Sequence, residues 1–438
     1  MSPRASNRVR VLVLSFEYGP LRNGGLATAM DALCGALDRQ SFEPVIVLPR
    51  SGLTPPWPRA DRVTGPHCEA EVFRHDGCEI WLLASERLDD GVIYPEPASY
   101  ACIKKFDDYG ERIAELLPRL DVDLVHLQDV FGYKCILAAR QLGKPVILTI
   151  HRLHDDEPPS AFAELCAVHL ADHVTTVSHA YLADNPGFFN AARATRVIPN
   201  GVDLAFWHPP DGETVTQGRP ARKQHLLDRL GLPPRPTFAF IGRLDGEQKG
   251  LDVLLDAWQR ARNEAAFNLL VVGEGEEPVR VQVEAAVATG PADRIRFIHR
   301  HCDPAEVRAL LGAIDVVLIP SRYEPFGLIQ LEAMAMGAIP LASRTGGLAE
   351  VMVEMDTPSG FGRLFPPGDT AALAQAMIDL ARRAEADPTA LDPLREAAAA
   401  RVEAHSAAVM ARRYEALYRD ALAEALAETP ALATRRSP

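Results

Sequence analysis

Seven residues separate two glutamates, Glu324 and Glu332, in a segment that begins in a loop and runs into a predicted helix. The apolar run 315–320 before them is short and rich in β-branched residues, which predicts a buried parallel strand. Glu324 then lies in the loop, and Glu332 lies about two turns along the helix. The free N–H groups at the helix start, near Gly327 and Leu328, attract an anion such as a diphosphate. Because carboxylates beside a diphosphate can accept hydrogen bonds from sugar and ribose hydroxyls, the pattern indicates a sugar-nucleotide site.

Further candidate residues come after other predicted strands. Arg243 comes at the end of the strand 238–241, and Lys249 comes directly before the next helix. Both cations could reach a diphosphate and offset the negative charge that develops on it as a glycosidic bond breaks. His151 ends the strand 146–150. Ligands of doubly wound sheets bind at the carboxyl ends of the strands, so all three side chains are candidate site residues.

Glycine-rich turns come directly after predicted strands at three places. Gly24 and Gly25 come after the first strand, Gly273 after a strand of the second half, and Gly346 after Thr345 near the end of another. Paired glycines permit a positive φ and a close approach of the backbone to a ligand, and a helix start directly after them adds donors for phosphate. Such turns are common, so a glycine turn alone is weak evidence for a binding site, and it supports one only together with the cations and carboxylates above.

The composition is that of a globular protein long enough for two domains. The chain has 438 residues, of which 47% are hydrophobic and 24% charged. The net charge of −13 argues against nucleic acid as a partner, because nucleic-acid-binding surfaces are basic. No apolar run approaches ~18 residues, and the strand-like run 9–16 is too short for a signal peptide. We therefore expect no integral membrane association and a cytoplasmic location.

The cysteines favour neither disulfides nor a metal site. Seven cysteines, an odd number, include no C-x-x-C pair, which predicts reduced and mostly buried thiols. His67 and Cys68 could be combined with His75 and Cys78 into a zinc site, but the spacing is irregular and the region is rich in proline. No metal is therefore expected.

Strand and helix patterns alternate along the whole chain, with Gly and Pro at the joints. The first half predicts helices at 28–39 and 105–119 and strands at 8–16, 44–48, 124–127, 146–150, 174–177 and 195–198. The second half predicts a helix at 251–262 and strands at 238–241, 269–272, 295–298, 316–319 and 339–342. Such alternation predicts an α/β fold with parallel strands and crossover helices on both faces.

Residues 321–334 resemble the Glu-x7-Glu motif of retaining glycosyltransferases with the GT-B fold, families 4 and 5. The sequence Ser-Arg-Tyr-Glu-Pro-Phe-Gly-Leu-x-Gln is similar to the corresponding segment of the starch and glycogen synthases of family 5. Phe326 is an exception, because family 5 usually has Cys at this position, whereas Phe is common in family 4. Residues 240–250 resemble the family's Arg-x4-5-Gln-Lys-Gly element. The likeness extends from Glu17 to about Glu350, in the right order and spacing.

The resemblance implies a retaining, metal-independent transfer of a hexosyl group, glucosyl being favoured, from a nucleotide diphosphate sugar to an acceptor hydroxyl. The implied catalytic residues are His151, Arg243, Lys249 and Glu324, and Asp129 is implied as a contact of the sugar or the acceptor. The implied donor-binding residues are Arg22, Gly24, Gly25, Gly273, Phe326, Gly327, Leu328, Glu332, Thr345 and Gly346. No cofactor is expected; the co-substrate would be an ADP- or UDP-linked sugar, and the acceptor a carbohydrate or a small hydroxylated molecule.

The same resemblance implies a domain plan with two doubly wound, Rossmann-like domains that face each other across a cleft. Residues 1–207 would form the acceptor-side domain and residues 221–400 the nucleotide-sugar-binding domain. The Pro/Gly-rich, polar segment 208–220 is typical of a linker between them. The tail 401–438 has a helical pattern, and in GT-B proteins the last helix commonly crosses back onto the first domain.

Besides Phe326, three single positions and one segment depart from the family pattern. Arg22 replaces a Lys in a loop that is one residue shorter, which exchanges a point charge for a rigid fork. Gln128 replaces the second His of the family's His-x-His-Asp segment, and Cys302 occupies a position where glycogen synthases tend to have an aromatic residue. After His151 the chain has Arg-Leu-His-Asp-Asp rather than Asn-Leu with a Gln-Gly, on the side where the acceptor binds.

These departures leave other functions open. The acceptor could be a small molecule, such as a sugar phosphate or an aminocyclitol, instead of an α-glucan. The chain could also be a sugar-nucleotide hydrolase or epimerase. A third alternative is a non-catalytic nucleotide-sugar-binding scaffold, but an inactive site has no physical need for two cations and two carboxylates together.

Overall fold

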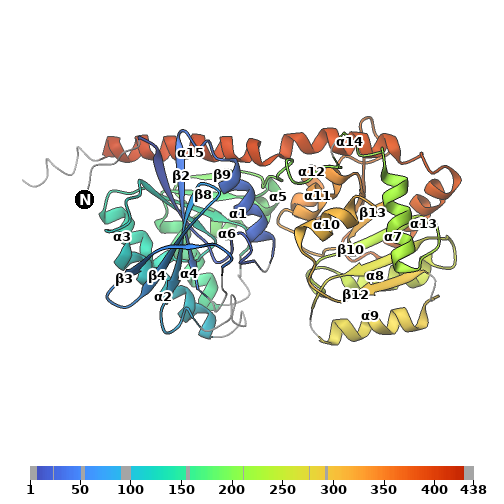
Figure 1. Cartoon of the computed structure of the whole chain (residues 1–438), viewed down its shortest axis with the longest axis horizontal. Helices are drawn as coiled ribbons and strands as arrows, with labels where there is room; N and C mark the ends of the chain where they lie inside the picture. Colours follow the sequence, from blue (N-terminus) through green and yellow to red (C-terminus); the bar gives the residue numbers. More distant parts are fainter. Residues whose placement is uncertain are drawn as a thin grey trace, which may run out of the picture. The chain divides into compact units, whose positions relative to one another are not determined.

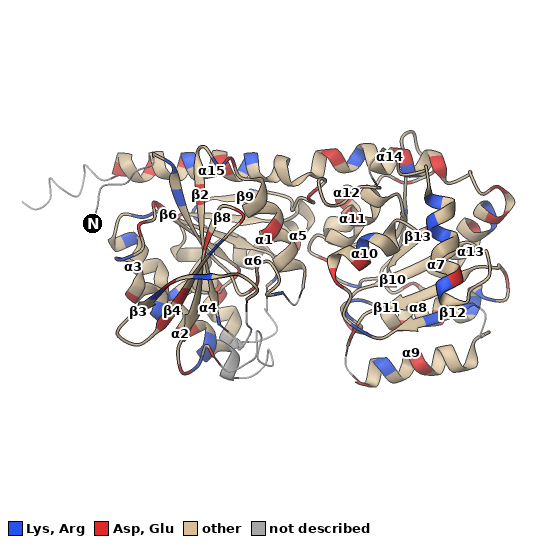
Figure 2. Cartoon of the chain, in the orientation of Figure 1, with Lys and Arg blue, Asp and Glu red and all other residues tan. Residues whose placement is uncertain are grey.

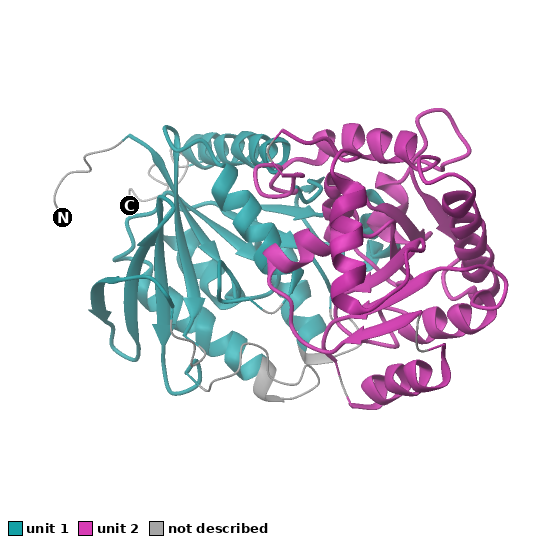
Figure 3. Ribbon diagram, turned by 45° about the vertical axis from the view of Figure 1, so that its right-hand side comes forward, with its two compact units in different colours: residues 1–201, 407–438 teal, residues 202–406 magenta. Residues whose placement is uncertain are grey.

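The chain folds into two compact units, of which each has its own sheet and helices (Figures 1 and 3). This computed structural model describes residues 7–22, 24–50, 55–89, 100–153, 158–210, 212–275, 277–291 and 294–428. Unit 1 consists of residues 1–201 and 407–438, and unit 2 of residues 202–406. Within the described ranges no helix is both long enough and apolar enough to cross a membrane.

The sheet of unit 1 has the strand order β3-β4-β5-β2-β1-β6-β7-β8-β9. Its strands are β1 (Val9–Leu14), β2 (Phe42–Pro49), β3 (Arg59–Thr64), β4 (Glu69–His75), β5 (Cys78–Ala84), β6 (Leu124–Gln128), β7 (Val146–Ile150), β8 (His173–Thr176) and β9 (Thr195–Val197). All pairings are parallel except β3 with β4 and β4 with β5. The chain order reverses between β1 and β6, so the loops after these two strands flank the switch point where ligands of such sheets bind.

The antiparallel strands β3, β4 and β5 were not among the predicted elements. Side chains of β3 are almost all exposed, so this strand has no apolar alternation to detect. The turn between β4 and β5 is formed by Asp76 and Gly77, which both have a positive φ. An Asp-Gly pair between two strands is a strong hairpin signal, and it could have revealed β4 and β5.

Helices cover both faces of this sheet. They are α1 (Gly25–Ala36), α2 (Tyr100–Leu116), α3 (Ile136–Gln141), α4 (Pro158–Leu170), α5 (His179–Asp184), α6 (Pro186–Phe189) and α15 (Ala407–Glu428), with a short 3₁₀ turn at Tyr133–Cys135. The C-terminal helix α15 packs against α1, and Glu415 on it accepts a hydrogen bond from the backbone N–H of Asp38 (2.8 Å). Unit 1 is therefore built from both ends of the chain.

The sheet of unit 2 has the order β12-β11-β10-β13-β14-β15, and all of its pairings are parallel. Its strands are β10 (Thr237–Ile241), β11 (Asn268–Val272), β12 (Ile295–Ile298), β13 (Val316–Ile319), β14 (Ile339–Ser343) and β15 (Arg363–Phe365). This is the strand order of a doubly wound nucleotide-binding sheet, with its switch point between β10 and β13. The predicted α/β fold class is confirmed in both units.

The helices of unit 2 pack on both faces of its sheet. They are α7 (Arg219–Leu230), α8 (Leu251–Ala261), α9 (Glu277–Thr289), α10 (Pro304–Leu311), α11 (Leu328–Met336), α12 (Gly346–Val351), α13 (Thr370–Ala386) and α14 (Asp392–Val402), with a 3₁₀ turn at Glu403–His405. The division between the units falls after Gly201, earlier than the linker-like segment 208–220, because the backbone of Val202 is hydrogen-bonded to His405 within unit 2.

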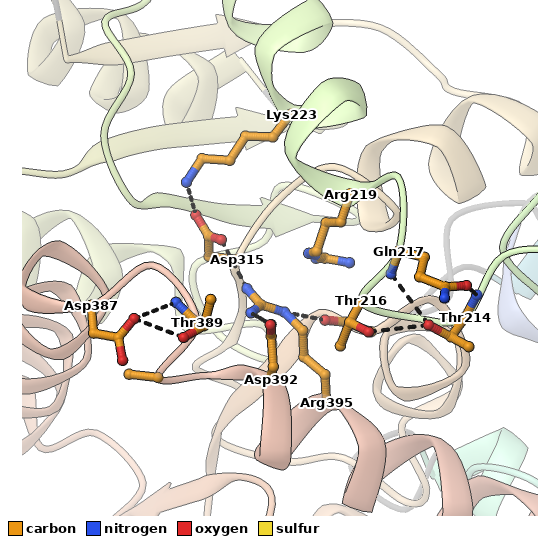
Figure 4. Close-up of polar contacts among 12 residues, drawn as sticks. Thr214, Thr216, Gln217, Arg219, Lys223, Asp315, Asp387, Thr389, Asp392 and Arg395 are labelled. Carbon is orange, nitrogen blue, oxygen red and sulfur yellow. Dashed lines mark hydrogen bonds and ion pairs between the residues drawn. The ribbon is translucent and has the colours of Figure 1, made fainter.

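A buried carboxylate, Asp315, connects four elements of unit 2 (Figure 4). It precedes β13 and accepts hydrogen bonds from Arg395 of α14 (2.9 Å), Lys223 of α7 (2.5 Å) and the backbone N–H of Thr237 at the start of β10 (2.8 Å). Nearby, the buried guanidinium of Arg219 donates to backbone carbonyls, among them that of Met336 at the end of α11 (2.9 Å). These contacts lie at the amino ends of β10 and β13, opposite the edge where ligands bind, so they stabilise the sheet without occupying the site.

We predict that Asp315→Ala destabilises unit 2 by about 3–5 kcal/mol, because it removes the buried carboxylate that Arg395 and Lys223 share and leaves Arg395 with Asp392 alone. The side chain of Arg395 is only 2% exposed, so water cannot replace the lost partner. The measurement is urea unfolding of the full chain. Asp379→Ala, an exposed carboxylate on α13 that is hydrogen-bonded to Gln375, is the matched control and should change the unfolding free energy by less than about 0.5 kcal/mol. Equal effects of the two variants would contradict the prediction.

Candidate active site

The candidate site of unit 2 lies at the carboxyl ends of β10 and β13, on both sides of the switch point. Lys249 comes after β10, and its Nζ lies 2.6 Å from Oε2 of Glu324, which comes after β13. The hydroxyl of Ser321 donates to the same carboxylate oxygen (3.2 Å). The structure thus brings together two predicted residues that are far apart in the sequence. Glu324 is only 9% exposed, so its charge is balanced locally by Lys249 rather than by water.

Glycines allow the loops at this edge to pack backbone against backbone. A Cβ added to Gly346, which has a φ of 47°, would overlap the carbonyl oxygen of Glu324. A Cβ on Gly250 would overlap the carbonyl oxygen of Pro320, and one on Gly273 would overlap that of Gly242. The glycine turns therefore hold the loops after neighbouring strands in contact. Whether Gly273, Thr345 and Gly346 also contact a donor stays a prediction.

Arg243 lies at the surface of the same edge. Its side chain is 58% exposed, and its Nη2 contacts Oδ2 of Asp245 (2.8 Å) and Oε1 of Gln248 (2.9 Å). Burial opposes ionisation of Asp245, but hydrogen bonds from the backbone N–H of Gln248 and from Arg243 hold the pKa of this carboxyl below its usual range. Arg243 is thus oriented by a neighbouring carboxylate and remains accessible to an anion.

The start of α11 has the geometry expected for an anion site. Gly327 caps the helix with a φ of 91°, and no side chain caps the first N–H groups, which begin at Leu328. Glu332 is buried in the second turn of this helix, and the Phe326 ring is buried before it, with its centroid 6.5 Å from that of the His405 ring. A Cβ on Gly327 would overlap the end of the Leu348 side chain, and the φ of 91° is strained for any other residue, so the backbone conformation at this helix start favours glycine.

In unit 1 the glycine loop after β1 is held by carboxylates. The backbone N–H of Gly24 donates to Oε2 of the buried Glu17 (2.8 Å). Arg22 donates to the carbonyl oxygen of Gly19 (2.7 Å) and forms an ion pair with Asp31 of α1. Burial raises the pKa of Asp31, with Arg22 opposing that shift. Arg22 is held by Gly19 and Asp31 in this structure, and its donor-binding role stays a prediction.

Gly24 and Gly25 lie where this loop runs into α1. Gly24 has an extended backbone (φ −166°), and an added Cβ would meet nothing within 4 Å, so neither strain nor crowding requires glycine there. Gly25 is the first residue of α1, and the neighbouring Asn23 lies outside the described residues. The fold itself therefore gives no reason for a glycine at position 24, which is compatible with the predicted approach of a donor.

The loops after β6 and β7 bring His151 and Asp129 together. One carboxylate oxygen of Asp129 accepts hydrogen bonds from the backbone N–H groups of His151 (2.6 Å) and Arg152 (3.2 Å). Asp129 itself has a positive φ of 52°, an uncommon backbone conformation for a residue other than glycine. Oε1 of Gln128 lies 2.9 Å from Nε2 of His151. Asp129 thus positions the His151 loop. Residues 154–157, which include the unusual His-Asp-Asp sequence, lie outside the described residues.

Behind His151, a buried polar network joins three strands to the C-terminal helix. His126 of β6 contacts the hydroxyl of Tyr418 through Nδ1 (2.8 Å) and that of Thr149 through Nε2 (2.7 Å). Thr149 also contacts the hydroxyls of Thr175 (2.7 Å) and Tyr414 (3.0 Å). Burial, together with the neighbouring His151, lowers the pKa of His126 to about 3. The network therefore contains a neutral histidine.

Three residues of the site had no role assigned from the sequence. Glu17 binds the glycine loop, Ser321 binds Glu324, and Gln128 binds His151. Glu17 is the first residue of the stretch that resembles the family, and Ser321 is the first residue of the Glu-x7-Glu segment, so the ends of these stretches were the available signal. No signal pointed to the contact of Gln128, because it depends on the register of β6 and β7. Within the described residues, no group of three or more His, Cys, Asp or Glu side chains is arranged to hold a metal ion.

Charged side chains elsewhere are mixed in sign. In Figure 2, acidic and basic residues are interspersed along α15 and form no stripe of one sign there. In unit 2, Arg243, Lys249 and the N–H groups at the start of α11 supply local positive charge for an anionic ligand.

Two stretches of the chain match known families. Residues 235–383 match the family described as glycosyl transferases group 1, and residues 23–206 match glycosyltransferase family 4. The glycogen synthase of Methylocella silvestris is 30% identical over 471 residues, which cover 89% of this chain and 94% of the relative. The glycogen synthase of Granulibacter bethesdensis is 28% identical over 442 residues, which cover 84% of this chain and 91% of the relative.

Solved structures share the fold. The catalytic domain of starch synthase IV from Arabidopsis thaliana, bound to ADP and acarbose, matches with a TM-score of 0.81 at 21% identity, covering 95% of this chain and 100% of that one. Sucrose-phosphate synthase from Thermosynechococcus elongatus matches with a TM-score of 0.72 at 22% identity and the same coverage. These likenesses confirm the predicted GT-B fold.

We predict that Gly346→Ala lowers the unfolding free energy of unit 2 by about 1–3 kcal/mol, because the new Cβ combines a positive φ with overlap of the Glu324 carbonyl. The measurement is the urea midpoint of the purified chain. Gly35→Ala, within α1 and with open space around its Cα, is the control and should be neutral or stabilising by up to about 1 kcal/mol. Unchanged stability of the Gly346 variant would show that the loops do not need this contact.

We also predict that the chain loses stability as the pH falls below about 6.5. Burial lowers the pKa of His151 to about 4 and that of His126 to about 3, whereas both would titrate near 6.5 in the unfolded chain. Between these values the unfolded chain binds more protons, so the unfolding free energy falls with pH by up to about 1.4 kcal/mol per pH unit for each histidine. Urea unfolding between about pH 6.5 and 5 measures this slope. His126→Asn should reduce it, and an unchanged slope would contradict the assignment.

Proposed function

Because the chain belongs to the glycogen synthase family of glycosyltransferases, we propose that it transfers a glucosyl group from a nucleotide diphosphate glucose to a hydroxyl of an α-glucan, with retention of the anomeric configuration. The observation that carries this proposal is the ion pair of Lys249 and Glu324 at the switch point of the unit 2 sheet. A cation there can meet the diphosphate, and a carboxylate there can orient the sugar.

In the proposed reaction the acceptor hydroxyl attacks the anomeric carbon on the face from which the diphosphate leaves. The bond between the anomeric carbon and the phosphate oxygen breaks, and this oxygen takes the proton of the acceptor hydroxyl. Arg243 and Lys249 stabilise the negative charge that develops on the leaving diphosphate. The N–H groups at the start of α11 add to this stabilisation.

The paired state of Lys249 suits this role. Its ammonium group has three donors, of which Glu324 takes one, so it can bind a phosphate oxygen and keep its ion pair. Glu324 then has lone pairs left for hydroxyls of the sugar. Glu332, which is buried in the second turn of α11, is assigned to the ribose.

His151 is assigned to the transferred sugar. Burial lowers its pKa to about 4, so the imidazole is neutral near pH 7 and adds no positive charge to the sugar site. A neutral ring has one nitrogen that donates a hydrogen bond and one that accepts, which suits recognition of a hydroxyl. Asp129 supports His151 through its backbone N–H.

The donor base is a further part of the proposal. We favour an ADP- or UDP-linked sugar, since the family resemblance of the sequence extends to the Glu-x7-Glu and Arg-x4-5-Gln-Lys-Gly elements. The Arabidopsis starch synthase IV structure, whose fold this chain shares, is bound to ADP and acarbose. A small hydroxylated acceptor is the second candidate, favoured by the departure from the family sequence after His151 and by Gln128.

The direct test is incorporation of labelled glucose from ADP-glucose and from UDP-glucose into glycogen, with anomeric configuration measured by NMR. We predict that Glu324→Gln lowers the transfer rate at least ~100-fold without unfolding the chain, because it removes the charge that orients the sugar and pairs with Lys249. Glu264→Gln, an exposed carboxylate of unit 2, is the charge-matched control and should retain activity. Full activity of the Glu324 variant would contradict the assignment of this residue.

Thermal shift measurements with UDP, ADP and GDP and their glucose conjugates identify the donor independently of the acceptor. A ligand at ~100 times its dissociation constant should stabilise the chain by roughly 2.7 kcal/mol. A shift with one base that grows with glucose attached supports the transferase, and glucose release without an acceptor would instead support a hydrolase. No shift with any nucleotide, together with no transfer, would favour a non-catalytic scaffold.

A further inference from the structure

Gln128, the last residue of β6, is fully buried and contacts His151 directly. Its Oε1 lies 2.9 Å from Nε2 of His151, across the parallel pair of β6 and β7. With the amide in this orientation, the oxygen that faces Nε2 can only accept a hydrogen bond, so Nε2 of the neutral ring carries the proton. The proton position on His151 is therefore set by Gln128.

The second ring nitrogen is then an acceptor. In the described part of the chain, Nδ1 of His151 has no hydrogen-bond partner, and the residue retains partial exposure. A neutral Nε2–H ring thus presents an unprotonated Nδ1. Such a nitrogen can accept a hydrogen bond from a hydroxyl and cannot donate one.

The orientation of the Gln128 amide has a cost in stability. Its Nε2 group is buried and has no hydrogen-bond partner, and a buried donor without a partner typically costs about 1–3 kcal/mol. An apolar side chain of similar size at this position would avoid that cost. Packing alone therefore does not account for a glutamine here, whereas the contact with His151 does.

Resting on the function proposed above, we infer that Gln128 is a positioning residue of the transferase site: it holds His151 in the Nε2–H form, so that Nδ1 accepts a hydrogen bond from one hydroxyl of the transferred sugar. Gln128 does not touch the sugar and acts only through His151. If the amide were reversed, its NH2 group would donate to Nε2 of His151. The ring proton would then lie on Nδ1, and Nδ1 would donate a hydrogen bond instead of accepting one.

Few charged groups compete with Gln128 for control of this ring. On β6, His126 is neutral and its two nitrogens contact the hydroxyls of Tyr418 and Thr149. Asp129 contacts the backbone N–H of His151 rather than its ring, and the backbone N–H of the adjacent Arg152 donates to the same carboxylate. The ring proton is therefore controlled chiefly by the amide of Gln128.

The test compares Gln128→Leu with the wild type, using the donor and a set of donor analogues that each lack one sugar hydroxyl. We expect the leucine variant to lose kcat ~10- to 100-fold with the complete donor, with KM for the donor changed much less, because a misoriented ring fails in the transition state. With the analogue that lacks the hydroxyl facing Nδ1, the same substitution should cost less than ~3-fold. An equal loss with every analogue would overturn the inference.

Gln128→Glu tests the same contact through the pH profile. A carboxylate facing Nε2 favours the charged ring, so we expect activity to fall on the acid side of neutrality, where the wild type is unaffected by His151. A profile that matches the wild type would count against control of His151 by residue 128. Thr175→Val, which removes a buried hydroxyl of β8 without touching His151, is the control and should lose stability but retain kcat and the pH profile.

Histidine side-chain ¹⁵N NMR of the wild type tests the tautomer without any activity assay. We expect the protonated nitrogen of His151, assigned by comparison with His151→Asn, to be Nε2. A proton on Nδ1 would overturn the inference even if the chain is an active transferase. Conversely, an Nε2–H ring in a chain without transfer activity would contradict the proposed function and not the contact of Gln128, so the two failures are distinguishable.

Discussion

The candidate donor site depends on backbone packed against backbone at the carboxyl edge of the unit 2 sheet. The loops after β13 and β14 touch where Gly346 meets the carbonyl of Glu324, and the loops after β10 and β11 touch where Gly273 meets that of Gly242. A Cβ at either position would separate the loops. Because the contacts are between main chains, they fix the positions of the loop residues with little freedom. The fixed loops therefore hold the carboxylate of Glu324 and the ammonium of Lys249 within contact distance of each other.

The cations of the site are already paired with carboxylates. Lys249 contacts Glu324, Arg243 contacts Asp245, and Arg22 contacts Asp31. In a chain with a net charge of −13 such pairs keep each cation in place and limit binding of unrelated anions. A diphosphate that binds here gains less than it would from free cations, since it must share or exchange these partners. Selectivity for a complete sugar nucleotide, which also offers hydroxyls to the carboxylates, is the expected physical result.

The placement of the candidate residues in unit 2 could largely be predicted because they lie in short, continuous motifs. The strand before Glu324 and the helix after it are visible as an apolar run and a glycine-started helix, and their ends define where the side chains lie. The strand β3 could not be found by the same reasoning, because it is exposed and has no apolar face, whereas the Asp-Gly turn between β4 and β5 could have revealed those two strands. Contacts such as that of Gln128 with His151 depend on which residues of two strands lie side by side, and periodicity alone does not determine this register.

The helix α15 gives unit 1 an unusual order of assembly during synthesis. Its Tyr414 and Tyr418 are the partners of Thr149 and His126, yet the ribosome makes them after the whole of unit 2. Until α15 emerges, the nascent first unit exposes the surface of α1 that this helix covers, and His126 and Thr149 lack their tyrosine partners. Unit 2 is continuous in the chain and can complete its core first. The first domain to be translated is therefore the last to finish folding, and during that interval it is the part most in need of a chaperone.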